Sequence, residues 1–242
     1  MIFFDTPGLV VPRYRLHEVM MAQARSALSD ADLVILMLDA SNVPERGKDL
    51  GLASLEGSTK PVFLVINKTD LISKQDLLLL IATYSARFGF EEVFPVSALK
   101  QEGTDLLVPA IISRLPLHPA LYPPDILSDQ PDKFFVGEIV REKIFEAYRE
   151  EIPYSTTVEV VRFEEREGKK TVIDAEIYVE RDSQKGIMVG KGGLALKRVG
   201  EVARKDIEKY LSQKVFLSLH VKVRDEWRKS NAWLRRLGYS GE

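Results

Sequence analysis

A proline-rich stretch divides the chain into two parts that have different patterns of apolar residues. Five of the twelve prolines lie between Leu115 and Lys133. Proline lacks a backbone N–H donor and restricts φ, so this stretch is predicted to form neither a helix nor a central strand. We therefore expect a first domain at residues 1–115, a linker at 116–133, a second domain at 134–225 and a C-terminal helix at 226–242.

The composition excludes several classes of protein. The 242 residues include no cysteine, so neither a disulfide framework nor a thiolate metal site can form, and the three histidines are far apart. No apolar run reaches the roughly 20 residues that cross a membrane, and the N-terminus does not resemble a signal peptide. These features predict a cytoplasmic protein without a transmembrane segment.

In the first part, apolar runs alternate with helical patterns. Residues 33–38 and 62–66 are continuous apolar runs, as expected of parallel strands that are covered on both faces. Further strands are predicted at residues 2–4 and 93–96, and helices at 19–28, 46–55, 75–88 and 104–115. This alternation predicts a doubly wound α/β sheet.

The second part has a different order of elements. The predicted helices are at residues 134–148, 194–211 and 227–237, and the predicted strands are at 156–164, 171–180 and 215–223. Val202 is among the apolar residues that we expect the second of these helices to bury. A glycine-rich turn precedes that helix, and the order predicts an α+β domain with a single sheet.

Three short motifs follow predicted strands of the first part, where open α/β sheets bind their ligands. The first is Asp5-Thr6-Pro7-Gly8. A carboxylate at Asp5 can hold magnesium through water, and Gly8 lets a backbone N–H approach a terminal phosphate. Taken alone, the motif favours a plain turn, because turns use the same residues.

The second motif, Asn67-Lys68-Thr69-Asp70, follows a buried strand directly. A carboxylate at Asp70 can accept hydrogen bonds from both N1–H and the 2-amino group of guanine. Adenine offers neither donor, so such a site can reject it by about 10⁴-fold. Asn67 can tie the loop to its neighbours, and the Lys68 stem can lie along the base. A polar turn before a helix uses similar residues, but the place after a buried strand favours binding.

The third motif, Ser97-Ala98, has small side chains that let a backbone N–H reach the base carbonyl, and its weight comes only from its position. The three motifs together resemble those of the translation-factor-like GTPases. The resemblance implies a GTP-binding set of Asp5, Thr6, Pro7, Gly8, Leu9, Asn67, Lys68, Thr69, Asp70, Ser97 and Ala98. Leu9 stands where some of these GTPases carry a water-orienting glutamine, so slow intrinsic hydrolysis, or help from another group, is expected.

The phosphate-binding loop of that family is missing from this sequence. No G-x-x-x-x-G-K-[ST] occurs, and only four residues precede Asp5, where the family has this loop and a magnesium-binding threonine. We therefore expect a fragment or a misassigned start codon rather than a natural short protein. The sheet is expected to be open where the first strand is absent, and the chain is not expected to hydrolyse GTP as it stands.

In the second part, Gly190-Lys191-Gly192-Gly193 (the GKGG loop) precedes a predicted helix. Glycines let a phosphate backbone approach closely, Lys191 adds positive charge, and the helix N-terminus presents N–H groups. The predicted RNA-binding residues are Gly190, Lys191, Gly192, Gly193, Lys197 and Arg198. The neighbouring Ile187, Met188 and Val189 either line a groove for bases or belong to the core.

Positive charge is concentrated in the last 60 residues, which carry a net charge of +8, whereas the remainder carries −10. Such a basic region indicates either a polyanionic partner or a solvated helix face. The final helix carries Arg224, Arg228, Lys229, Arg235 and Arg236, which can attract RNA. Its two tryptophans, Trp227 and Trp233, are more often core residues than stacking platforms.

The order of elements in the second part resembles the type II KH domain, whose GxxG loop clamps about four nucleotides of a single strand. A GTP-binding domain joined to such a KH domain is the arrangement of the Era family. The resemblance implies GTP or GDP and magnesium as cofactors, and small-subunit ribosomal RNA near its 3′ end as partner, in assembly of the small ribosomal subunit.

Three points stay open at this stage. Peripheral contact with the inner face of the cell membrane is compatible with the resemblance. A nucleotide-independent KH-type RNA-binding protein with a degenerate first domain is the alternative function. A non-functional fragment with an exposed sheet is the third.

Overall fold

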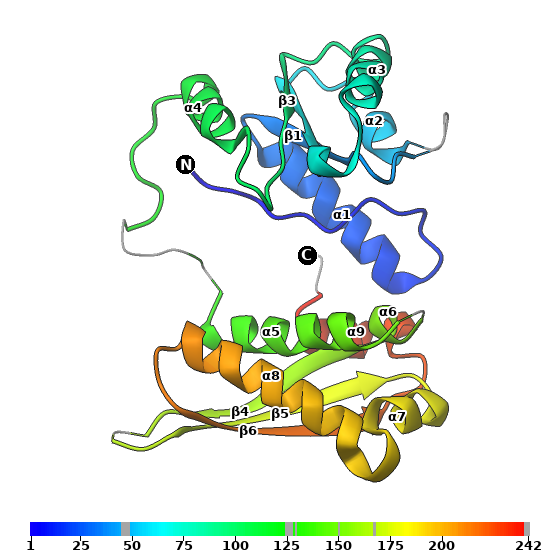
Figure 1. The fold of residues 1–242 in the computed structure, drawn as a ribbon, viewed down its shortest axis with the longest axis vertical. Coiled ribbons are helices and arrows are strands. Elements are labelled where there is room, and N and C mark those ends of the chain that lie inside the picture. Colours follow the sequence, from blue (N-terminus) through cyan, green and yellow to red (C-terminus); the bar gives the residue numbers. More distant parts are fainter. Residues whose placement is uncertain (45–48, 124–127, 129, 150, 167, 240–242) are drawn as a thin grey trace. The chain divides into compact units, whose positions relative to one another are not determined.

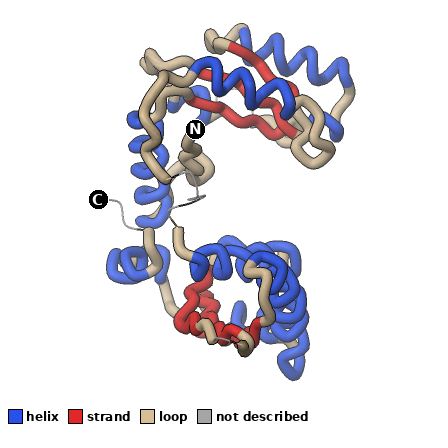
Figure 2. The backbone as a smooth tube through the Cα atoms, turned by 90° about the vertical axis from the view of Figure 1, so that its left-hand side faces the viewer, coloured by secondary structure: helices blue, strands red, loops and turns tan. Residues whose placement is uncertain are grey.

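The computed structural model describes all residues except 45–48, 124–127, 129, 150, 167 and 240–242. The chain forms two compact units, Met1–Leu121 and Tyr122–Ser240, and each has its own three-stranded sheet (Figure 1). Figure 2, coloured by secondary structure, shows that each set of strands has its own helices. The boundary between the units falls inside the proline-rich stretch. The precise domain limits stay a prediction.

The first unit has a parallel sheet in the order β1-β2-β3. Its elements are α1 (Arg15–Asp30), β1 (Val34–Asp39), α2 (Leu50–Ser54), β2 (Val62–Asn67), the 3₁₀ turn η1 (Thr69–Leu71), α3 (Lys74–Ser85), β3 (Glu92–Pro95) and α4 (Thr104–Arg114). Asp39 pairs with Asn67 and Ile66 with Pro95, so the carboxyl ends of all three strands lie at one edge.

Helices cover both faces of this sheet, as the apolar runs predict. Leu64 and Ile66 of β2 pack with residues of α2 and α3, whereas Phe63 and Val65 pack with Ile111 of α4. All five apolar side chains of β2 are at most 1% exposed. A strand buried on both faces needs a continuous apolar run rather than an alternating one, and this explains residues 62–66.

The strand predicted at residues 2–4 is wrong. Met1–Phe4 is exposed, and no helix or strand precedes α1 in the described part of the chain. A strand requires a neighbour for its backbone hydrogen bonds, and β1 pairs with β2 alone among the described strands. The free edge of β1 and the 62% exposure of Met37 agree with the expectation of an open sheet. The helix predicted from residue 46 begins at Leu50, and residues 45–48 lie outside the described residues.

In the second unit, α5 and α8 pack against one face of a mixed sheet, as Figure 1 shows. Its elements are α5 (Asp132–Ala147), α6 (Glu151–Tyr154), β4 (Thr157–Glu164), β5 (Thr171–Val179), α7 (Asp182–Val189), the 3₁₀ turn η2 (Lys191–Gly193), α8 (Leu194–Tyr210), β6 (Val215–Val223), the 3₁₀ turn η3 (Trp227–Lys229) and α9 (Asn231–Arg236). The central strand β5 runs antiparallel to β4 and parallel to β6.

The core of this unit lies between α5, α8 and the sheet. Val140 and Ile144 of α5 and Ala203 of α8 are completely buried there. The predicted burial of Val202 is wrong, since this side chain is 46% exposed. At 3.6 residues per turn, Val202 lies about 100° from the centre of the stripe formed by the buried residues of α8.

Two helices of the second unit were not predicted, and a third predicted helix is interrupted. The eight-residue α7 contains Gly186 and buries only Met188, so it has no visible helical period. The single turn α6 is shorter still. The helix predicted at residues 227–237 is a 3₁₀ turn followed by α9, which begins where the Ser230 hydroxyl accepts the Trp233 N–H.

Candidate nucleotide and RNA sites

The loops that follow β2 and β3 are joined by hydrogen bonds. The Asn67 side-chain oxygen accepts from the backbone N–H groups of Lys68 (2.7 Å) and Ala98 (3.1 Å). The Thr69 N–H and hydroxyl both donate to the Val96 carbonyl, at 3.2 Å and 2.9 Å. The structure thus brings together residues 67–70 and 97–98, which the sequence predicted to share a base-binding site.

Asp70 is held as a charged acceptor at this edge of the sheet. Its Oδ1 accepts from the hydroxyl of the buried Ser97 at 2.7 Å, and its side chain is only 9% exposed. The Ser97 hydrogen bond, with a smaller contribution from the Lys100 ammonium, lowers the pKa of Asp70 below its ordinary value. An ionised, oriented and nearly buried carboxylate is the group that can accept two adjacent N–H donors, as guanine requires.

The turn after Ser97 depends on a glycine. Ser97 and Glu102 exchange two backbone hydrogen bonds, and the chain leaves this turn through Gly103 at φ +77°. A Cβ on Gly103 would lie 2.5 Å from the Pro95 carbonyl oxygen. The sequence predicted that a backbone N–H of the Ser97-Ala98 motif reaches the base carbonyl; the Ala98 N–H donates to Asn67 here.

Asp39, at the end of β1, contacts the predicted base site, and the sequence analysis did not single it out. The Lys68 ammonium donates to Asp39 Oδ2 at 2.6 Å, and the Ser41 hydroxyl and N–H donate to Oδ1 at 2.6 Å and 2.9 Å. These contacts, Lys68 first, lower the pKa of Asp39 to about 2. The sequence did indicate this position, because Asp39 directly follows the apolar run 33–38, just as Asn67 directly follows the run 62–66.

The DTPG motif lies in the irregular segment before α1. Asp5, Thr6 and Gly8 are exposed, and Pro7 and Leu9 are half-buried. The next residue is tied to α1 by a hydrogen bond from the Val10 N–H to Met21 Sδ at 3.5 Å. Among the described residues no three His, Cys, Asp or Glu side chains are grouped so that they could hold a metal ion. The predicted roles of these five residues stay predictions, since magnesium at Asp5 would need ligands from water and phosphate.

The GKGG loop joins α7 to α8 and faces solvent. Gly190 has φ +69° and ψ 178°, and a Cβ there would lie 2.7 Å from Ala195 Cβ. Gly192 and Gly193 also have positive φ, but no atom lies within 4 Å of their added Cβ positions. Gly190 therefore allows the end of α7 to pack closely against Ala195 of α8, whereas Gly192 and Gly193 leave open space above the backbone.

The basic residues predicted beside this loop are exposed. Lys191 extends from the loop itself, and Lys197 and Arg198 follow on the first turns of α8. Lys197 lies 4.0 Å from Glu201 in a solvated pair, which contributes little. Of the three apolar residues before the loop, Met188 is fully buried core, Val189 packs partly against that core and Ile187 is 57% exposed.

The basic C-terminal region is largely neutralised by acidic residues of its own unit. Arg228 pairs with Glu180, Lys229 with Glu226 and Arg236 with Glu159, and Arg224 lies over the Trp233 ring. Trp227 is 2% exposed and belongs to the core, as predicted. Most of the positive charge of this C-terminal region is therefore engaged within the fold.

Comparison with known proteins assigns the chain to a family. The chain is 46% identical over 240 residues to the GTPase Era of Geobacter metallireducens. The aligned residues cover 99% of this chain and 80% of that protein. The chain belongs to the Era family of GTPases. The family model for the elongation factor Tu GTP-binding domain matches residues 2–117, and the KH domain model matches residues 151–228.

Two solved Era structures share the fold. One, in complex with MgGDPNP and nucleotides 1506–1542 of 16S ribosomal RNA, has a TM-score of 0.91 and 35% identity over 98% of this chain and 81% of that chain. The other, a variant of Aquifex aeolicus Era bound to GDP and aluminium fluoride, has a TM-score of 0.89 and 34% identity over the same shares. The predicted fold, a GTPase-type α/β sheet followed by a KH domain, is confirmed. No helix among the described residues is long and apolar enough to span a membrane.

Proposed function

We propose that this chain binds single-stranded ribosomal RNA of the small subunit through the GKGG loop, and that it takes part in assembly of that subunit. The observation that carries the proposal is the open backbone at Gly192 and Gly193: apart from their chain neighbours, no described residue comes within 4 Å of either Cβ position. A sugar-phosphate strand can approach such a backbone closely, where α8 presents its first N–H groups and Lys191, Lys197 and Arg198 add positive charge.

The related Era in complex with nucleotides 1506–1542 of 16S ribosomal RNA supports the identity of the RNA. We propose Gly190, Lys191, Gly192, Gly193, Lys197 and Arg198 as the RNA-binding residues of this chain. Membership of the Era family does not favour the alternative of a nucleotide-independent RNA-binding protein. Cytoplasmic location and peripheral membrane contact stay predictions, and the relatives lend the membrane contact no support.

Fluorescence anisotropy with a labelled RNA of those nucleotides tests the RNA site. Lys191→Glu is expected to weaken binding strongly and to reduce its salt dependence, because a phosphate contact is lost. Lys169→Glu is the matched control, because it makes the same charge change in the β4–β5 turn. This turn lies at the start of β5, and the nine residues of that strand, about 30 Å, separate it from the start of the segment that leads to α7 and the loop. Equal loss in the two variants would show a general charge effect, and an unchanged Lys191→Glu would contradict the proposed site.

We further propose that residues 67–70 and 97–98 recognise guanine in GTP or GDP, with magnesium at the phosphates near Asp5. The charged and nearly buried Asp70 fits the two N–H donors of guanine, and Asn67 holds its loop in place. Asp5, Thr6, Pro7, Gly8 and Leu9 would face the phosphates. Slow hydrolysis at a site with Leu9 stays a prediction.

Amide NMR spectra recorded during titration with GDP and with ADP test the base site, since the method detects weak binding. We expect GDP, and not ADP, to shift the amide signals of residues 67–70 and 97–98. Ser97→Ala should weaken the GDP response, because the bond that orients Asp70 is removed. Ser54→Ala, on the exposed side of α2, is the control. Equal shifts with both nucleotides would contradict guanine recognition.

A further inference from the structure

The short helix α7 is attached to the rest of its unit at both ends by side chains from other elements. It has only eight residues, and its C-terminal end leads directly into the GKGG loop. Helices of this length are not stable on their own, so external contacts must determine where α7 lies. The direction of the loop therefore depends on the residues that hold α7.

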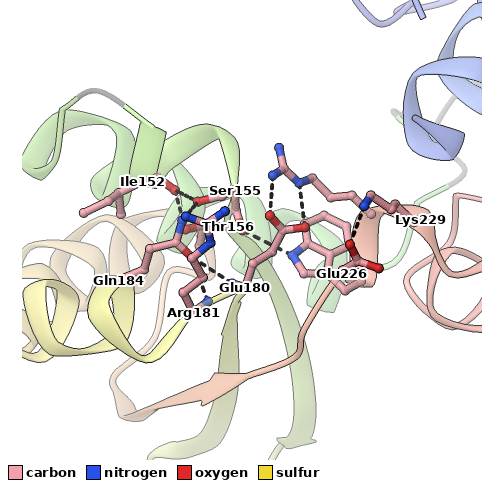
Figure 3. Close-up of polar contacts among 10 residues, drawn as sticks. Ile152, Ser155, Thr156, Glu180, Arg181, Gln184, Glu226 and Lys229 are labelled. Atoms are coloured by element: carbon pink, nitrogen blue, oxygen red, sulfur yellow. Dashed lines mark hydrogen bonds and ion pairs between the residues drawn. The ribbon is translucent and has the colours of Figure 1, made fainter. Parts of the chain in front are cut away.

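The N-terminal end of α7 is held by a polar network that Figure 3 shows. The Gln184 side-chain oxygen accepts from the backbone N–H groups of Glu180 (2.9 Å) and Arg181 (3.0 Å), and its amide nitrogen donates to Ser155 Oγ (2.9 Å). Ser155 in turn donates from its hydroxyl to the Ile152 carbonyl (3.0 Å). Through this chain of bonds, α6 is joined to the start of α7.

The segment after β6 closes the same network from the other side. Arg228 donates from Nε to Glu180 Oε1 at 2.9 Å and from Nη2 to Glu180 Oε2, and the two side chains are 20% and 15% exposed. The buried Trp227 donates from its indole nitrogen to the Ser155 carbonyl at 3.2 Å. A two-pronged arginine–carboxylate pair of low exposure fixes both distance and angle.

At its C-terminal end, α7 accepts a hydrogen bond from the side chain of another element, in addition to the packing of the buried Met188 in the core. Tyr148, at the end of α5, donates from its phenol to the Met188 carbonyl at 2.6 Å. That carbonyl is among the last four of α7, which have no N–H partner within the helix. Burial raises the pKa of Tyr148 above its ordinary value.

We propose that Tyr148 and the Arg228–Glu180 pair are positioning residues for RNA binding, because they hold α7 and thereby orient the GKGG loop. The inference rests on the proposed function of that loop. The hydroxyl of Tyr148 and the carboxylate of Glu180 are engaged inside the unit, so neither contacts RNA. Without them the loop must be ordered when RNA binds, and this lowers affinity about threefold to tenfold for each.

Tyr148→Phe tests the C-terminal attachment, since it keeps the ring and removes only the hydroxyl. The expected result is an RNA dissociation constant about threefold to tenfold higher, with faster amide hydrogen exchange at residues 190–193. Tyr210→Phe is the matched control, because the Tyr210 hydroxyl makes a similar hydrogen bond to Asp132 (2.9 Å), at the end of α8 remote from the loop. Unchanged affinity in Tyr148→Phe, or an equal loss in Tyr210→Phe, would overturn the inference.

Glu180→Gln tests the attachment at the N-terminal end of α7, because the two possible explanations predict opposite changes in RNA affinity. It removes one negative charge and releases Arg228, so a purely electrostatic effect would strengthen RNA binding. A positioning role of the Arg228–Glu180 pair predicts weaker RNA binding instead. Unchanged or stronger RNA binding would overturn the role proposed for this pair. Lys191→Glu, measured alongside, separates the two proposals. If it binds as the unsubstituted chain does, the RNA site itself fails; if it alone weakens binding, only the positioning roles fail.

Discussion

Replacing Gly190 by alanine should destabilise the second unit more than alanine at Gly192 or Gly193. At φ +69° and ψ 178°, Gly190 occupies backbone space that is essentially reserved for glycine, and a side chain there costs about 1–3 kcal/mol. The added Cβ would also lie 2.7 Å from Ala195 Cβ and 3.2 Å from the Ala195 nitrogen, so the first turn of α8 must move. Together these effects predict a loss of about 2–4 kcal/mol.

Urea unfolding followed by tryptophan fluorescence measures this loss in the correct unit. Both tryptophans of the chain, Trp227 and Trp233, lie in the second unit, so their emission reports that unit alone. Gly186→Ala, in the preceding helix α7, is the control, because alanine there meets no described atom within 4 Å beyond its own helix and neighbours, and helical alanine is favoured by about 0.5–1 kcal/mol. If Gly190→Ala proved as stable as Gly186→Ala, the assigned conformation of the loop would be wrong.

Three further predictions concern single contacts. The pKa of Asp39 is lowered to about 2, so its contribution to stability is complete above about pH 4 and is lost between about pH 4 and 2. Asp39→Asn should therefore flatten the pH dependence of hydrogen exchange in the first unit over that window. An unchanged profile would count against the Lys68 contact. Asn67→Ala should accelerate amide exchange at Ala98, whose acceptor it removes, and unaltered exchange would show that the bond is not formed. Trp227→Phe should lower the free energy of unfolding by about 1–3 kcal/mol, measured by circular dichroism, because it leaves a cavity and an unpaired Ser155 carbonyl; a loss below about 0.5 kcal/mol would place the indole outside the core.

Elements with a strong local signal were predicted well from the sequence. The run that became β2 is continuous and apolar because helices cover both of its faces, and the five prolines separate the units. The predicted base-binding motifs could be placed because they follow the strands β2 and β3. Each of these signals lies within a few consecutive residues.

Features that depend on distant partners could not be predicted in the same way. Residues 2–4 look like a strand but pair with no strand of the described part of the chain, and α7 is held by residues far away in the sequence. The arginines of the C-terminal region looked available for RNA, yet Arg228 and Arg236 pair with Glu180 and Glu159, which lie 48 and 77 positions earlier. Charge counting alone does not reveal such pairing.

The most direct test of RNA recognition is an NMR titration of the isotopically labelled chain with the RNA of nucleotides 1506–1542. We expect the largest amide shifts at residues 190–193 and in the first turns of α8, with small changes in α9. Shifts concentrated in α9, or none near Gly192 and Gly193, would contradict the claim that this loop receives the RNA backbone.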